Sequence, residues 1–348
     1  MRSLIRVLAL KLLVLLALAG LASGAAAQAV KVFYSEGDSS GLIQPIHSIG
    51  VVNSDGTGKQ TIHSGLGFVP NLDIDPLNQH IYWLELTGGN NVYNSRIRRS
   101  DFNGSNLVDL VVNRDELGGL SLDLSQGKIY WIEQQNLNGP GAVYASDLNG
   151  LNIQTIATSV LESRTLEVDS NSGVYGGLTS NIEFFSAPLA GGPTTPLVAL
   201  PAQTETWGMT VDTGAGNFYW SESSSTGGVI ATSSIATPAR QVVPGSGSLT
   251  DFPLGLDFDP ITNKLYWGSV DSSGSQLVGR ISYAEPNGAS RQTLPLAFDA
   301  AVHDVAVLAV PEPSTLWLCA ALLALRRSSV STQLSPRHAP QRACMPRT

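Results

Sequence analysis

Cysteine is almost absent from this 348-residue chain, and its two cysteines, Cys319 and Cys344, both lie in the last 30 residues. The chain before them therefore has no disulfide, no thiolate metal site and no cysteine nucleophile. Charged residues are also scarce, at 14% of the chain against a usual value of about 25%. Together with 35 glycines, this composition disfavours coiled coils and long surface helices and favours many strands joined by tight turns.

Basic residues are few in the middle of the chain. Between residues 29 and 310 there are 12 lysines and arginines against 27 aspartates and glutamates, a net charge of −15. An acidic surface repels phosphate backbones, so nucleic acid is excluded as a partner, whereas cations, basic peptides and neutral glycans are not.

Long apolar runs occur only near the two ends. At the N-terminus, three basic residues precede an apolar run at 12–22, and three alanines precede Gln28. This is the order of a secretory signal peptide, and the run is shorter than the about 20 residues of a transmembrane helix. Residues 1–27 are therefore predicted to be a signal peptide that exports the body of the chain, residues 28–309.

A repeat of about 45 residues fills the body. Each of five units has a short alternating segment that ends in Asp, followed by a segment centred on tyrosine. The five pairs of segments are 71–75 with 81–83, 119–123 with 129–131, 165–169 with 174–176, 208–212 with 218–220, and 255–259 with 265–267. The tyrosines are spaced by 48, 45, 44 and 47 residues, and Tyr34 lies 48 residues before the first of them. Alternation predicts strands, and four antiparallel strands in about 45 residues is the period of a propeller blade.

The number of units predicts a closed ring of six blades. Five units are complete, and the N-terminal one begins with its aromatic strand, 32–36, without the strand that should precede it. The segment 303–307 has the pattern of that missing strand, and pairing the two would close the ring and protect its edges. The predicted fold class is all-β: a monomeric six-bladed propeller with four antiparallel strands per blade and with tyrosines and tryptophans packed between blades.

The repeats resemble the YWTD repeats of six-bladed propellers of the low-density-lipoprotein-receptor type, over about residues 30–308. The aromatic pair of that family is matched at Tyr82-Trp83, Tyr130-Trp131, Tyr219-Trp220 and Tyr266-Trp267, and the Asp of its preceding strand at Asp75, Asp123, Asp169, Asp212 and Asp259. The Thr-Asp half is replaced by Leu84-Glu85, Ile132-Glu133, Ser221-Glu222 and Gly268-Ser269, and Gly176 replaces one tryptophan. The resemblance implies the fold, but the ligands of the family's receptor members do not transfer.

The C-terminal region has a tripartite pattern. Val310-Pro311-Glu312-Pro313 is followed by an apolar run at 316–325 and by Arg326-Arg327. This order resembles the PEP-CTERM sorting signal of Gram-negative bacteria. The resemblance implies that residues 310–327 enter the membrane before an exosortase-type enzyme processes the chain for the envelope, the cell surface or the extracellular matrix. Ten apolar residues are few for a membrane span, so a disordered basic tail is the alternative. Residues 328–348 are predicted to be a disordered basic tail.

No catalytic set is recognisable. The histidines lack the spacing of a zinc site, and no nucleophile elbow or phosphate-binding loop is present. The pairs Asp73/Asp75 and Asp257/Asp259 could suggest calcium, but they lack an EF-hand loop, and their place at strand ends favours turn capping. We therefore expect no catalytic residue, no metal ligand and no cofactor. The alternative is that the propeller binds a calcium ion.

One face of the predicted propeller combines acidic and aromatic residues, because the loops before inner strands and the ends of second strands meet there. The ligand-binding candidates are Phe68, Glu85, Glu133, Glu205, Trp207, Glu222, Asp251 and Phe252, with Glu36, Glu116 and Asp304 on the same face. Exposed aromatics within an acidic rim suit a basic or sugar-like ligand. The alternative is that the glutamates are solvated or form structural ion pairs with Arg98, Arg114 and Arg164.

The sequence thus favours an exported, non-enzymatic propeller that binds a protein, a basic peptide or a glycan on its acidic face. One alternative is an enzyme similar to the gluconolactonase-like propellers, which hold calcium with Glu, Asn and Asp. The other is a structural matrix component without a specific ligand.

Overall fold

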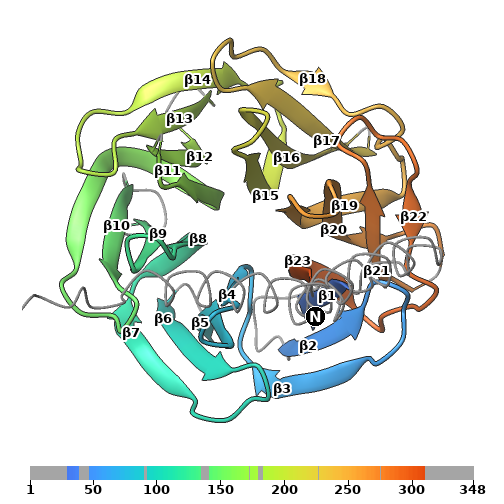
Figure 1. The fold of residues 1–348 in the computed structure, drawn as a ribbon, viewed down its shortest axis with the longest axis horizontal. Helices are drawn as coiled ribbons and strands as arrows, with labels where there is room; N and C mark the ends of the chain where they lie inside the picture. Colours follow the sequence, from blue (N-terminus) through green and yellow to red (C-terminus); the bar gives the residue numbers. More distant parts are fainter. Residues whose placement is uncertain are drawn as a thin grey trace, which may run out of the picture. The chain divides into compact units, whose positions relative to one another are not determined.

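Six blades of antiparallel strands surround a central axis in the computed structural model of the chain (Figure 1). The structure describes residues 30–38, 47–89, 92–134, 141–171, 173–178, 183–225, 227–274 and 276–309. The predicted all-β propeller of six blades, each with four antiparallel strands, is confirmed. The predicted signal peptide, sorting signal and basic tail lie outside the described residues, and within them no helix has the length and apolar character of a membrane span.

Each blade has four strands, which follow one another from the axis outward. Blade 1 contains β23 (Ala301–Ala309), β1 (Val30–Gly37), β2 (His47–Asn53) and β3 (Gln60–Leu66). Blade 2 contains β4 (Leu72–Asp75), β5 (His80–Gly89), β6 (Val92–Asp101) and β7 (Val108–Arg114). Blade 3 contains β8 (Glu116–Asp123), β9 (Lys128–Gln134), β10 (Gly141–Asp147) and the first part of β11 (Gln154–Asp169). Blade 4 contains the rest of β11, β12 (Gly173–Leu178), β13 (Glu183–Ala187) and β14 (Thr195–Ala199). Blade 5 contains β15 (Glu205–Asp212), β16 (Asn217–Ser224), β17 (Gly227–Ser234) and β18 (Gln241–Val242). Blade 6 contains β19 (Asp251–Asp259), β20 (Lys264–Asp271), β21 (Val278–Ala284) and β22 (Gln292–Thr293).

The ring closes inside blade 1, where the C-terminal strand β23 pairs with the N-terminal strand β1. The pairing is antiparallel, places Val30 opposite Ala309 and Gly37 opposite Ala301, and shifts register next to Ser35. The predicted closure is therefore confirmed, and β2 covers the other side of β1. Because β1 begins where β23 ends, the chain enters and leaves the ring at one point.

Strand β11 is shared between two blades, which the repeat pattern did not predict. Its first part, up to Val160, pairs with β10. Its second part, from Leu161, pairs with β12, and that pairing has a register break between Leu161 and Leu166. Blades 3 and 4 therefore form one seven-stranded sheet, whereas each of the other blades is a separate four-stranded sheet.

Aromatic residues of the second strands pack between blades, as predicted. Trp83, Trp131 and Trp220 are fully buried. At the tryptophan position of blade 4, a Cβ on Gly176 would lie 2.5 Å from the carbonyl oxygen of Thr165, so no larger residue fits there. The interface is nevertheless filled, because Phe184 packs edge-on against Trp220 with ring centroids 5.2 Å apart.

The second aspartate of each inner-strand pair caps the turn that follows, as predicted. The Asp75 carboxylate accepts a hydrogen bond from the Leu77 N–H at 3.0 Å, and Asp259 accepts one from the Ile261 N–H at 2.9 Å. These bonds satisfy backbone donors that the tight turn leaves without strand partners.

The turn-capping prediction is wrong for the first aspartates, Asp73 and Asp257. Their carboxylates accept hydrogen bonds from the next inner strand, from the Leu122 N–H at 2.9 Å and the Val307 N–H at 2.7 Å. The same bridge between neighbouring inner strands joins Ser121 to Val168, Thr210 to Phe258 and Asp304 to Leu72. Polar side chains near the axis thus tie five of the six blade interfaces by satisfying backbone donors of the neighbouring blade.

Candidate functional site

The end of the blades at which inner strands begin and second strands end is termed the top face, and the opposite end the bottom face. All eight predicted ligand-binding residues lie at the top face. Phe68 precedes β4, the glutamates Glu85, Glu133 and Glu222 lie in the last half of β5, β9 and β16, and the remaining four, Glu205, Trp207, Asp251 and Phe252, begin β15 and β19.

The three glutamates of the second strands are buried and ion-paired. Glu85, Glu133 and Glu222 are 2%, 7% and 4% exposed. Glu222 accepts two hydrogen bonds from Arg240, at 2.8 and 2.6 Å, and one from the Trp220 indole N–H at 2.7 Å. The structure therefore shows these glutamates in structural ion pairs, and their charge is compensated within the protein.

The ion pairs differ between blades. Glu85 lies 2.9 Å from both Arg96 and Arg98, and although burial disfavours its ionised form, hydrogen bonds from Arg96, the Gly67 N–H and Arg98 hold its pKa below the usual range. Glu133 pairs with Arg114 at 3.2 Å, and there burial outweighs the effect of the arginine and raises the pKa of Glu133.

The other acidic candidates have different surroundings. Asp251 pairs with Arg291 at 3.1 Å, Glu36 lies 3.6 Å from Lys59, and Asp304 is buried at the axis. Glu205 is exposed and has no ion-pair partner within the described part of the chain. Glu205 is therefore the predicted candidate whose charge is most available to a ligand.

Within the described residues, Arg164 contacts two of the predicted aromatic residues and makes no ion pair with a glutamate. The expected ion pair is therefore wrong for this arginine. Its guanidinium lies 4.2 Å from the ring centroid of Trp207 and 6.0 Å from that of Phe68. Its carbonyl oxygen accepts a hydrogen bond from the Asn71 side-chain amide at 3.3 Å. Phe68 and Trp207 belong to blades on opposite sides of the ring, so these contacts connect both sides above the axis.

Two buried histidines lie beside Phe68, and no sequence pattern indicated this cluster. The rings of His47, His303 and Phe68 have centroids 4.9 to 5.1 Å apart. Burial lowers the pKa of His47 to about 4 and that of His303 to about 3, so both imidazoles are neutral at pH 7. They are 256 residues apart in the sequence, and only the closure of blade 1 brings them together.

Four carboxyl groups gather near the axis, on the inner strands. Burial first, and then the neighbouring carboxylates, raise the pKa of Asp73 to about 6 and that of Asp257 to about 7. The same causes raise the pKa values of Glu167 and Asp304 well above the usual range. Within the described residues, no three carboxylate, imidazole or thiol groups are placed to hold one metal ion.

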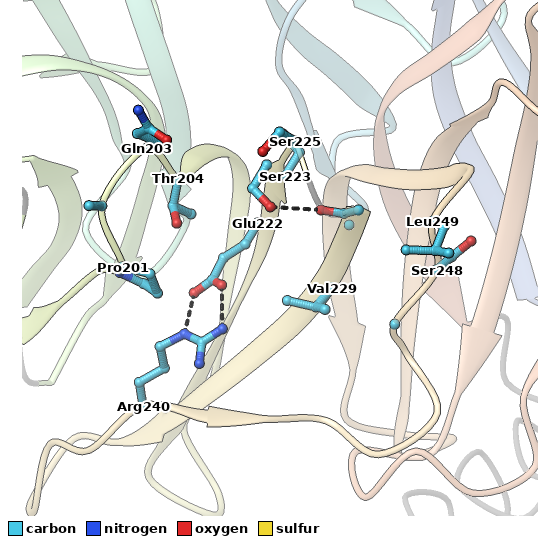
Figure 2. Close-up of a pocket in the computed structure, with 15 residues that line it drawn as sticks. Pro201, Gln203, Thr204, Glu222, Ser223, Ser225, Val229, Arg240, Ser248 and Leu249 are labelled. Atoms are coloured by element: carbon cyan, nitrogen blue, oxygen red, sulfur yellow. Dashed lines mark hydrogen bonds and ion pairs between the residues drawn. The ribbon is translucent and has the colours of Figure 1, made fainter.

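A pocket of about 680 Å³ opens at the top face of blade 5 (Figure 2). It is lined by residues 201–204 before β15, residues 222–225 and 227–229 of the β16–β17 hairpin, Arg240, and residues 247–249 before β19. Of the predicted site residues it contains Glu222, and Trp207 adjoins it because the Trp207 indole N–H donates to the Ser223 hydroxyl at 3.0 Å. Sequence analysis missed the pocket because its walls are loops with no recurring motif.

No protein-family model and no curated protein matches the chain. Solved structures do share its fold. A chain in the crystal structure of a nidogen/laminin complex is 13% identical with a TM-score of 0.61, over 81% of this chain and 98% of that chain. TolB from Acinetobacter baumannii is 12% identical with a TM-score of 0.62, over 80% and 66% of the two chains, and a putative TolB from Agrobacterium tumefaciens is 11% identical with a TM-score of 0.55, over 82% and 99%. At these identities the likeness concerns the fold alone.

Proposed function

We propose that this protein is an exported, non-enzymatic binding propeller of the bacterial envelope or extracellular matrix, and that its ligand occupies the pocket at the top face of blade 5. Residues 1–27 would direct its export, and residues 310–327 its sorting by an exosortase-type enzyme. Neither segment lies within the described residues, so these two assignments rest on the sequence patterns alone.

The pocket is the observation that supports a binding role. Its volume of about 680 Å³ falls in the usual range for ligand sites, about 300–1,000 Å³. It is built from loops on a rigid ring, which is where proteins commonly place binding residues. The fold by itself does not distinguish a binding protein from an enzyme, because propellers occur in both.

The experiment measures hydrogen exchange of the body, residues 28–309, with and without extracellular material from cells that produce the protein. Binding in the pocket should slow exchange at 201–204, 223–228 and 247–249 and leave the bottom-face turns unchanged. The material is divided into a protein fraction and a polysaccharide fraction. If neither fraction protects these loops, the proposed function is wrong.

A further inference from the structure

The residues that line the blade 5 pocket present no uncompensated charge to a ligand, and the exposed Glu205 lies beside the pocket, opposite Ser223. Its charged pair is Glu222 with Arg240, and Figure 2 shows the two side chains directed at each other in a bidentate arrangement. Arg240 uses Nε and Nη2 for this pair, which leaves the N–H groups of Nη1 to donate elsewhere. A charged ligand would therefore gain little here, whereas a neutral polar ligand could use the remaining donors.

The backbone edges beside the pocket are already paired. Gly228, at the start of β17, exchanges two hydrogen bonds with Ser248, at 2.8 and 3.0 Å. An extended peptide that adds a strand to a sheet needs an unpaired edge. This wall of the pocket offers none, which disfavours a peptide that adds a strand there.

The side chains that face the pocket are rich in hydroxyl groups. Gln203 and Thr204 lie on one side and Ser248 on the other, with Ser223 and Ser225 between them (Figure 2). In the part of the chain that the structure describes, Gln203, Thr204 and Ser225 make no side-chain hydrogen bond, so their donors and acceptors are available. Hydroxyl and amide groups both donate and accept, as the hydroxyl groups of a sugar do.

Trp207 borders this set of polar groups. Its indole N–H is fixed by the Ser223 hydroxyl at 3.0 Å, and Arg164 lies 4.2 Å from its ring centroid. The indole is therefore held rigidly at the inner rim, where it is only half-buried. A rigid aromatic ring beside unpaired hydroxyls gives an apolar contact for the carbon-bound face of a pyranose and hydrogen bonds for its hydroxyls.

From these features we propose that the blade 5 pocket binds a neutral oligosaccharide. This inference rests on the proposed function, which places the ligand in this pocket, and adds the chemical class of the ligand. Recognition comes from the side chains of Gln203, Thr204 and Ser225 and from the N–H groups of Arg240, with Trp207 as the apolar contact. Because the pocket carries no net charge, binding does not depend on ionic strength.

The test titrates the body, residues 28–309, which contains the whole closed ring and its core, with cellopentaose, maltopentaose, laminaripentaose and penta-N-acetylchitopentaose. Tryptophan fluorescence and calorimetry follow binding at 50 and 500 mM NaCl, and tetra-arginine is titrated in parallel. We expect at least one oligosaccharide to bind with a dissociation constant that changes less than twofold with salt.

Two variants and a control test whether the ligand binds in the blade 5 pocket. Ser225→Trp fills the pocket from an exposed turn and should weaken binding more than tenfold, and Thr204→Val should weaken it about three- to tenfold by removing one hydrogen bond. Ser273→Trp, in the corresponding turn of blade 6 and outside the pocket, is the matched control and should change binding less than twofold. If no oligosaccharide binds, or if Ser225→Trp and Ser273→Trp have equal effects, the inference is wrong. Salt-dependent binding of tetra-arginine alone, lost in Ser225→Trp, would overturn the oligosaccharide while leaving the proposed binding function intact.

Discussion

Replacing Asp257 by asparagine should make the protein more stable at alkaline pH and not at acidic pH. Asp257 lies near the axis, where burial and the neighbouring Asp73 raise its pKa from 3.8 to about 7. A raised pKa means that the folded protein holds the proton more tightly than the unfolded chain does. The stabilising contribution is therefore fully present below about pH 3.8 and is lost as the pH rises through about 7.

The size of this effect follows from the shift. A shift of one pH unit corresponds to about 1.4 kcal/mol, so a shift from 3.8 to about 7 removes about 4 kcal/mol of stability between pH 4 and pH 8. Asparagine cannot ionise and still accepts the Val307 N–H, but it cannot also accept the Phe258 N–H that Asp257 holds at 2.7 Å. Losing that bond costs about 1 kcal/mol at every pH. Asp257→Asn should thus be about 1 kcal/mol less stable than the native body near pH 4 and about 3 kcal/mol more stable at pH 8.

Urea unfolding of residues 28–309 at pH 4, 6 and 8, followed by tryptophan fluorescence, measures the difference. Asp299→Asn is the control, because it makes the same substitution at an exposed aspartate and removes no buried acid. A difference between Asp257→Asn and the native body that stays the same from pH 4 to pH 8 would show that Asp257 does not titrate as a buried acid.

Three further outcomes follow from the fold. Trp131→Ala should lower the free energy of unfolding by about 3–5 kcal/mol, because Trp131 is fully buried and stacks on Tyr144 with ring centroids 5.9 Å apart. An unchanged urea midpoint would mean that Trp131 is not a core residue. His303→Phe should lose less stability than the native body between pH 6.5 and pH 4. The lowered pKa of His303, about 3, gives stability that is fully present above pH 6.5 and is lost on acidification; equal acid sensitivity in urea titrations would refute this. Deletion of residues 303–308 should abolish the monomer in size-exclusion chromatography, because it removes the partner of β1 and exposes an apolar edge; a folded monomer would contradict the closure.

The blades were predictable from the sequence because each of them repeats a local pattern. Alternation of apolar and polar residues selects a strand, and the tyrosine-tryptophan pair recurs because every blade interface needs a large apolar side chain. The pairing of Glu85 with Arg98 could also be predicted from the sequence, since β5 and β6 form a hairpin and the partners lie 13 residues apart.

Other features depend on contacts between distant parts of the chain. Whether Asp73 caps its own turn or accepts the Leu122 N–H is decided by how closely two blades approach at the axis, which no local pattern records. The same holds for Arg164, whose contacts with Phe68 and Trp207 reach across the ring. The pocket at blade 5 escaped prediction because loop positions, rather than residue types, define it.

The pairing of Val30 with Ala309 has a consequence for how the protein presents its pocket. Both chain ends of the ring leave from the bottom face of blade 1, whereas the pocket opens at the top face of blade 5. Any attachment made through either flanking segment therefore transmits its load to the ring at the β1–β23 pair, on the face opposite the pocket.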